Sequence, residues 1–228
     1  MGGYYINVNV RSDSAEAVRD AMIAAFGAEG FQLVQTDPAA EVVENEDQLP
    51  DGDDWYGAIM SGHNENDWVT IYVDDWKDSG VLARWVSETL QTQAIEIWVA
   101  DDVNWGYSYW ENGRVRDRFA DDPKTMTEDA AEREMYKGAP EVLGPVLEVT
   151  DAAFAKVLVD AKERAGQFAG PSVGELCEAL ALPFEQAFTG YDYFFSDDPD
   201  DYSIDLPHWP DFRHFAFRHP ERRERLAE

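Results

Sequence analysis

The chain has 228 residues and a formal net charge of −29, because it contains 47 Asp and Glu but only 18 Lys and Arg. A charge of this sign repels nucleic acid and anionic membranes and attracts basic surfaces, so we expect neither nucleic acid nor a membrane as a partner. Hydrophobic residues make up 44% of the chain and aromatic residues 13%, enough for a folded core, and the sequence has no uncharged apolar run of the roughly 18 residues that a membrane-spanning helix needs.

The beginning of the chain and its cysteine content favour a soluble cytoplasmic protein. Residues 1–8 lack the basic region and the long apolar region of a secretory signal. The lone Cys177 excludes an internal disulfide and a multi-cysteine zinc site, and we expect it to be buried and unreactive. An amino-acid composition rich in Asp and poor in Lys is also typical of salt-adapted organisms, in which salt screens the repulsion between carboxylates. The acidity therefore has an environmental explanation as well as a functional one.

The first sixty residues predict a β-α-β-β unit. Apolar residues of the segment 6–10 alternate with other residues, as in a half-buried strand. Apolar residues at helical spacing then predict a helix that ends at Gly27. The unit continues with a strand expected at 31–34, an acidic loop at 37–54 and another strand at 56–61.

A similar pattern returns in the next part of the chain, with a strand at 68–73, a helix at 79–90 and a strand at 95–99. Each of these elements follows the matching element of the first unit at a nearly constant separation in the sequence. Segments 4–61 and 67–119 therefore indicate duplicated β-α-β-β units in one mixed sheet, or else the coincidence of two ordinary strand-helix-strand patterns.

The dipeptide Asn112-Gly113 gives the clearest local signal. It separates two segments with strand-like alternation, 105–111 and 114–119. Asn and Gly both tolerate the positive φ of a tight hairpin turn, so this dipeptide predicts a β-hairpin.

Helical patterns dominate after residue 125. Thr150 and Ser172 are the expected N-caps of two helices, and a strand is expected near 211–219, followed by a charged tail. The chain is thus predicted to be an α+β protein, with a sheet domain at 1–125 and a mainly helical region at 126–228. Because no Gly/Ser-rich linker joins the two, we expect the second region to pack on the first.

The tryptophans are concentrated, since most of the 8 lie between residues 55 and 110. If helices cover the aliphatic face of the sheet, then Trp68, Tyr72 and Trp98 lie on the opposite face. So large an aromatic face is not left in water. Either the C-terminal helices cover it or a partner protein does.

Pairs of acids follow two predicted strands, Asp74-Asp75 and Asp101-Asp102. If these strands run parallel, both pairs lie at the same edge of the sheet. Four carboxylates there would suit Ca²⁺ or Mg²⁺, although Asp residues also cap turns in this position.

No catalytic motif is present: the sequence has no nucleophile elbow, phosphate loop or dinucleotide fingerprint. We therefore expect an acidic binding protein without enzymatic activity, cofactor or metal, of the immunity or antitoxin kind, which neutralises a basic toxin such as a nuclease. The alternatives are an enzyme with a divalent metal held by the carboxylates, and a structural module whose acidity reflects salt adaptation. The oligomeric state stays open. The residues expected to contact the partner are Asp51, Asp53, Asp54, Trp55, Tyr56, Asp74, Asp75, Asp101 and Asp102.

Overall fold

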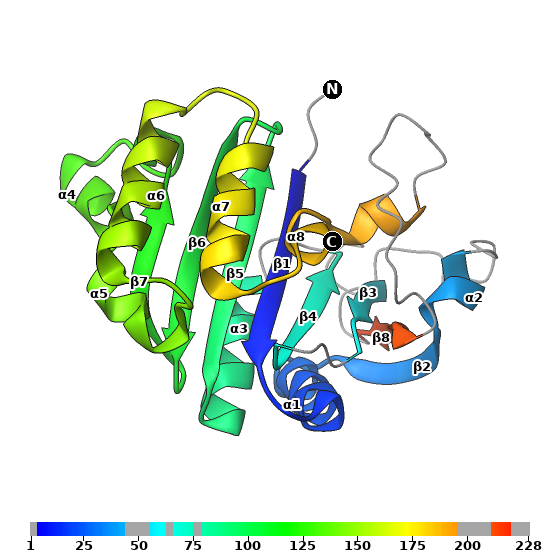
Figure 1. Ribbon diagram of the computed structural model, residues 1–228. Helices are drawn as coiled ribbons and strands as arrows, with labels where there is room; N and C mark the ends of the chain where they lie inside the picture. The colour runs from blue at the N-terminus through cyan, green and yellow to red at the C-terminus, as the bar shows by residue number, and fades with distance from the viewer. Residues whose placement is uncertain (1–3, 44–54, 63–65, 75–78, 196–210, 220–228) are drawn as a thin grey trace.

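The computed structural model describes residues 4–43, 55–62, 66–74, 79–195 and 211–219 (Figure 1). Eight strands form one sheet in the order β2-β8-β3-β4-β1-β5-β6-β7, with helices on both faces, which confirms the α+β class. The strands are β1 (Tyr4–Arg11), β2 (Gln32–Pro38), β3 (Trp55–Met60), β4 (Trp68–Val73), β5 (Gln93–Ala100), β6 (Asn104–Glu111), β7 (Arg114–Ala120) and β8 (Arg213–Arg218).

Among the described residues, three helices come from the first half of the chain and five from the second half. They are α1 (Ala15–Ala28), α2 (Ala39–Val43), α3 (Ser79–Leu90), α4 (Ala130–Arg133), α5 (Pro140–Leu143), α6 (Asp151–Glu163), α7 (Gly170–Leu180) and α8 (Phe184–Ala187). Short 3₁₀ turns are η3 (Pro123–Thr125), η4 (Glu134–Tyr136), η5 (Gly144–Val146) and η6 (Tyr191–Phe195). Among the described residues, none of the helices is long and apolar enough to cross a membrane.

Helices α1 and α3 cover one face of the sheet. The alternation in β1 places Ile6, Val8 and Val10 on this face, where they pack with Met22 of α1 and Val86 of α3. Figure 1 shows α3 behind the central strands and α1 at the lower end of β1, and residues of both helices pack in one cluster. The predicted amphipathic strand and helices therefore form the first core.

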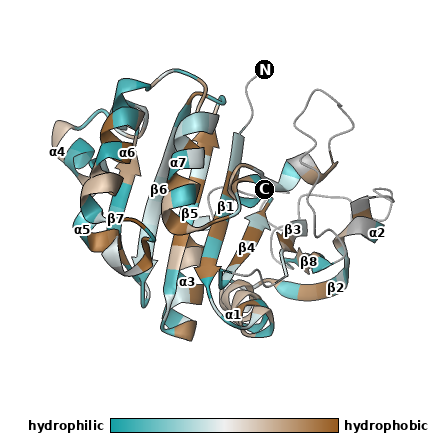
Figure 2. Ribbon diagram, viewed as in Figure 1, coloured by the Kyte–Doolittle hydropathy of each residue, from teal (hydrophilic) through white to brown (hydrophobic). Residues whose placement is uncertain are grey.

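The C-terminal helices cover the other face, with α6 over β6 and β7 and α7 over β5 and β6 (Figure 1). Trp68 is buried there, and its Nε1 donates a hydrogen bond to the Leu180 carbonyl at 3.0 Å. Tyr72 packs against Phe194 and Phe212 in a smaller cluster. Figure 2 shows hydrophilic and hydrophobic segments mixed along α6 and α7, as in helices with one buried side. The aromatic face is thus covered by this chain itself.

Trp98 does not belong to that face, which corrects the prediction. Strand β1 lies between β4 and β5, and its register places Ile6 opposite Trp98 and Asn7 opposite Ile97. Residues directly opposite each other in an antiparallel pair point to the same face. Trp98 therefore packs with the α1/α3 core, while the aliphatic residues of β5 face the C-terminal helices.

The hairpin at Asn112-Gly113 is confirmed. It joins β6 to β7, and the two residues have φ values of 51° and 78°. Both values lie in the left-handed region that this dipeptide tolerates. A Cβ added to Gly113 would lie 2.6 Å from the Cβ of Glu88, so glycine is required for space as well as for conformation.

Strand β8 changes the expected relation between the two halves of the chain. It pairs with β2 on one side and β3 on the other, so the C-terminal region contributes a strand to the sheet of the N-terminal region. All neighbouring strands are antiparallel rather than mixed, because β1 separates the parallel β4 and β5. The topology does not show a duplication of 4–61 and 67–119: β2 lies at the edge of the sheet, whereas β5 lies inside it.

Candidate functional site

The residues predicted to contact a partner are only partly placed by the structure. Asp51, Asp53, Asp54 and Asp75 lie outside the described residues. Trp55 is half-buried on β3, with the Arg218 guanidinium 5.8 Å from its ring centroid. Tyr56 is a correction to the predicted surface: it is 2% exposed and packs on Phe26 with ring centroids 5.0 Å apart. Because side chains alternate along β3, the Tyr56 side chain points into the core that packs on α1, so Tyr56 does not offer a contact surface.

Asp74 and Asp101 lie at the same edge of the sheet, as the sequence predicts. Strands β4 and β5 both pair antiparallel with β1 and are therefore parallel to each other. The first residues of β1 lie between their ends, and the Tyr4 hydroxyl donates to Asp101 Oδ2 at 2.9 Å. This hydrogen bond raises the pKa of Tyr4.

This edge does not form a metal centre from the described residues. With one strand between them, the ends of β4 and β5 are separated by about two strand spacings, roughly 10 Å. Within the described ranges no group of three His, Cys, Asp or Glu side chains could hold a metal ion. Asp101 and Asp102 have φ values of 53° and 59°, so they also serve the β5–β6 turn.

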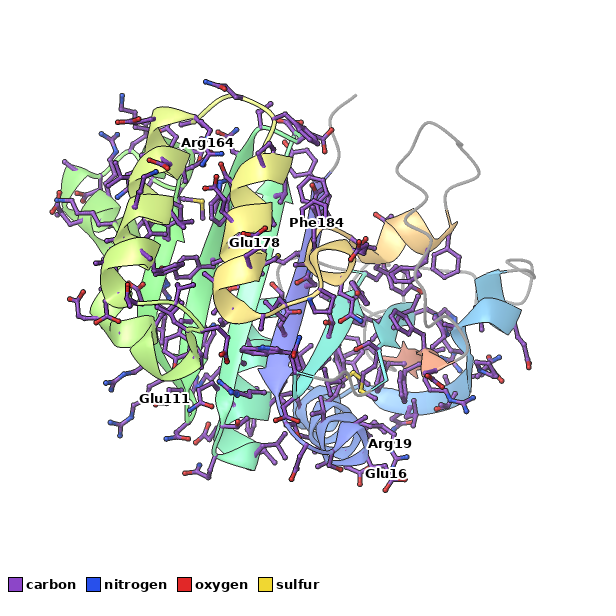
Figure 3. The ribbon with its side chains drawn as sticks, viewed as in Figure 1. Glu16, Arg19, Glu111, Arg164, Glu178 and Phe184 are labelled. Carbon is purple, nitrogen blue, oxygen red and sulfur yellow. The ribbon has the colours of Figure 1, made fainter. Side chains whose placement is uncertain are left out.

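Negative charge alone does not mark a site on this molecule. Exposed carboxylates lie on the α1/α3 layer, as at Glu16 and Glu88, and also on the opposite layer, as at Glu163 and Glu178. Figure 3 shows Glu16 beside α1 and Glu178 on α7, on opposite layers. A binding site must therefore be identified by a second kind of feature.

That feature is a pair of exposed phenylalanines at the start of α7 and α8, which we call the aromatic surface. Phe168 is 45% exposed and Phe184 is 37% exposed, and both rings pack on Phe188, which is 5% exposed. Phe184 stacks on Phe188 with centroids 5.1 Å apart, and Phe168 meets it edge-on at 5.8 Å. On its inner side Phe188 contacts Tyr5 of β1 at 4.9 Å. The exposed rings are thus anchored to the core.

Two glycines of α7 lie beneath the exposed rings. Gly170 and Gly174 are one helical turn apart and so share a side of the helix. A Cβ at Gly170 would lie 2.6 Å from the Phe168 ring, and a Cβ at Gly174 would lie 3.8 Å from the Phe184 ring. Gly170 is the first residue of α7, and its lack of a Cβ leaves room for the Phe168 ring to lie close to the helix.

Two exposed carboxylates lie near the aromatic surface along the chain. Glu185 directly follows Phe184, and Glu178 lies one turn beyond Gly174 on α7; both are exposed. Figure 3 shows Glu178 and Phe184 close together on the same side of the molecule. Beyond Phe168, the Ala169 amide donates to the Asp102 carbonyl at 2.8 Å, which brings the β5–β6 turn to this surface.

The same acids influence the buried Cys177. Burial raises the pKa of this thiol, and the negative charges of Glu185 and Glu178 raise it further. Because a thiol needs to ionise to react, Cys177 is a core residue rather than a nucleophile.

Buried amides of β1 hold the backbone on either side of Phe188. Asn7 Nδ2 donates to the Ala187 carbonyl at 2.8 Å and to the Thr189 carbonyl at 3.1 Å. Asn9 Nδ2 donates in turn to Asn7 Oδ1 at 2.7 Å, which orients the Asn7 amide. Both asparagines are fully buried. The sequence shows them only as the polar members of an alternating strand, so their role could not be predicted.

Buried titratable groups elsewhere lack access to a substrate. His214 is 2% exposed, and its Nε2 lies 2.8 Å from the Tyr191 hydroxyl. Burial lowers the pKa of His214 to about 4, although the charge of Asp37 opposes this shift. Burial likewise raises the pKa of Glu96, whose Oε1 accepts a hydrogen bond from Ser79 at 2.6 Å. Neither group opens to solvent, so both are structural in this conformation.

Comparisons with protein-family models, with curated protein sequences and with solved structures found no match for this chain. Among the described residues, the aromatic surface is the strongest candidate for a binding site.

Proposed function

We propose that this chain is a non-enzymatic acidic protein that binds a basic protein, in the manner of an immunity or antitoxin protein that neutralises a toxin. The observation that carries the proposal is the aromatic surface, formed by Phe168 and Phe184 and flanked by Glu178 and Glu185. Aromatic anchors supply most of the binding energy of many interfaces. Surrounding charge supplies orientation and speed of association.

The net charge of −29 supports a basic partner in particular. Attraction between opposite charges can raise an association rate by up to about 10³-fold, and this gain falls steeply with salt. The same charge opposes binding to nucleic acid. A basic nuclease fits both statements, since inhibition requires the acidic protein to occupy the surface that otherwise binds phosphates.

The test is biolayer interferometry of the purified chain against a panel of purified basic nucleases, with acidic proteins of similar size as controls. We expect saturable one-to-one binding to at least one nuclease, with an association rate that falls as NaCl rises from about 50 to 500 mM. We also expect that nuclease to lose activity when the chain is added in equal amount.

Phe168→Ala combined with Phe184→Ala should weaken this binding by at least 10-fold, about 1.4 kcal/mol, as expected for interface anchors. Val159→Ala is the matched control, because Val159 is a hydrophobic residue of α6 that is exposed but lies apart from the aromatic surface. Weak, unsaturable binding to every basic protein, unaffected by the double substitution, would contradict the proposal.

A further inference from the structure

The partner's chemistry can be specified further from the composition of the aromatic surface. Phe168 and Phe184 are partly exposed, and both pack on the buried ring of Phe188. A phenyl ring attracts a cation above its face, and arginine is found in this position more often than lysine. A partner side chain over Phe184 would also lie near the carboxylate of Glu185 or Glu178.

Arginine and lysine differ in how they use such a surface. The guanidinium is planar and weakly hydrated, so it can stack on a ring while its N–H groups donate to a neighbouring carboxylate. The lysine ammonium is a compact, strongly hydrated charge that gains less from a ring. A surface with charge alone would bind both, whereas a surface with rings and carboxylates together favours arginine.

The chain's own arginine on the loop before α7 does not fill this role. Arg164 donates to Glu175 at 2.5 Å through Nη2 and to the Asp160 carbonyl at 3.1 Å through Nε. The neighbouring carboxylate of Glu175 contributes to the raised pKa of this guanidinium. Arg164 is therefore engaged on the α6 side of α7.

We infer that the aromatic surface binds an arginine side chain of the basic partner, with the guanidinium over Phe168 or Phe184 and its N–H groups directed to Glu178 or Glu185. This inference rests on the proposed function and specifies the partner residue that the site recognises. It does not require that the partner be identified first.

The test uses two fluorescent peptides of equal length and charge, one of nine arginines and one of nine lysines, in anisotropy titrations at about 150 mM NaCl. We expect the arginine peptide to bind about 5-fold more tightly, which corresponds to about 1 kcal/mol of cation–π interaction. Phe168→Leu with Phe184→Leu keeps apolar side chains but removes the rings. This variant should reduce the ratio of the two affinities to about 1 and leave the lysine peptide unchanged.

Thermal unfolding and circular dichroism of the double variant check that it is folded, and Val159→Leu serves as a substitution of the same kind on α6. An affinity ratio near 1 for the wild-type chain, or a preference for arginine that survives in the double variant, overturns the inference while leaving the proposed function intact. If neither peptide binds, the proposed basic partner itself is contradicted.

Discussion

Replacing Asn7 tests whether buried polar groups of the sheet hold the aromatic surface in place. Asn7→Ala removes both hydrogen bonds to the carbonyls of Ala187 and Thr189, at 2.8 and 3.1 Å, and removes the acceptor for Asn9 Nδ2. A buried polar group left without a partner costs about 1–3 kcal/mol. With up to three such groups affected, and some relief from entering water, we expect the free energy of unfolding to fall by about 3–5 kcal/mol.

The matched control is Asn66→Ala. Asn66 Nδ2 also donates to a backbone carbonyl, that of Ala181 at 2.8 Å, but the side chain is exposed. Water can replace this bond, so the substitution should cost less than about 1 kcal/mol. Urea unfolding measures both variants.

Hydrogen exchange adds the local readout. Asn7→Ala should speed the exchange of backbone amides over 184–190 more than that of the α1 amides, because the segment around Phe188 loses its attachment to β1. Equal costs for Asn7→Ala and Asn66→Ala, or uniform exchange in the variant, would refute the argument that Asn7 positions this segment.

Three further outcomes follow from particular residues. Gly113→Ala should destabilise the chain by about 1–2 kcal/mol in urea unfolding, because of the positive φ and the contact with Glu88, whereas Gly27→Ala, with open space around its Cβ, should be neutral or stabilising. Because the pKa of His214 falls to about 4 in the folded chain from 6.5, the unfolded chain binds more protons between these values. The free energy of unfolding therefore keeps its full value above pH 6.5 and falls by up to roughly 3 kcal/mol as the pH drops toward 4. His214→Gln should remove this part of the pH dependence of unfolding, and an unchanged pH profile would contradict the assignment. Finally, the chain should unfold cooperatively already at about 50 mM NaCl; a chain that folds only near 1 M NaCl would favour salt adaptation as the origin of its acidity.

Local signals in the sequence predicted local structure well. Asn112-Gly113 forms its hairpin because the turn depends on two residues alone. Thr150 caps α6, and its Oγ1 accepts from the Ala153 amide. Ser172 was the wrong N-cap, because α7 begins earlier, at Gly170, and Ser172 is buried inside the helix. The close contact between Gly170 and Phe168 accompanies that earlier start, and no local pattern reveals it.

Long-range pairing could not be predicted in the same way. The insertion of β1 between β4 and β5 decides which face Trp98 joins, and alternation within a strand does not specify its neighbours. The aromatic surface depends on the corner between α7 and α8, which brings Phe168 and Phe184 onto Phe188. In the sequence Phe184 and Phe188 are four residues apart, the spacing of neighbours on one helical face, but no local pattern links Phe168 to them. The predicted acidic contact residues, by contrast, rest on pairs of acids, which form easily in a chain with 47 Asp and Glu, so the sequence alone does not distinguish them from acids elsewhere.

Strand β1 connects the core of the sheet to the proposed binding surface. One side of strand β1 contributes Ile6, Val8 and Val10 to a core. Its opposite side carries Asn7 and Asn9, which are fully buried. Apolar residues in these two positions would pack without needing hydrogen-bond partners. Buried amides contribute specificity when every group is paired, since any shift of the partner backbone leaves carbonyls unsatisfied. Asn7 imposes this requirement on residues 187 and 189, and so on the ring of Phe188 between them. A polar residue at the centre of the sheet thus holds a ring whose outer contacts are Phe168 and Phe184, and the position of the proposed binding surface is determined from inside the fold.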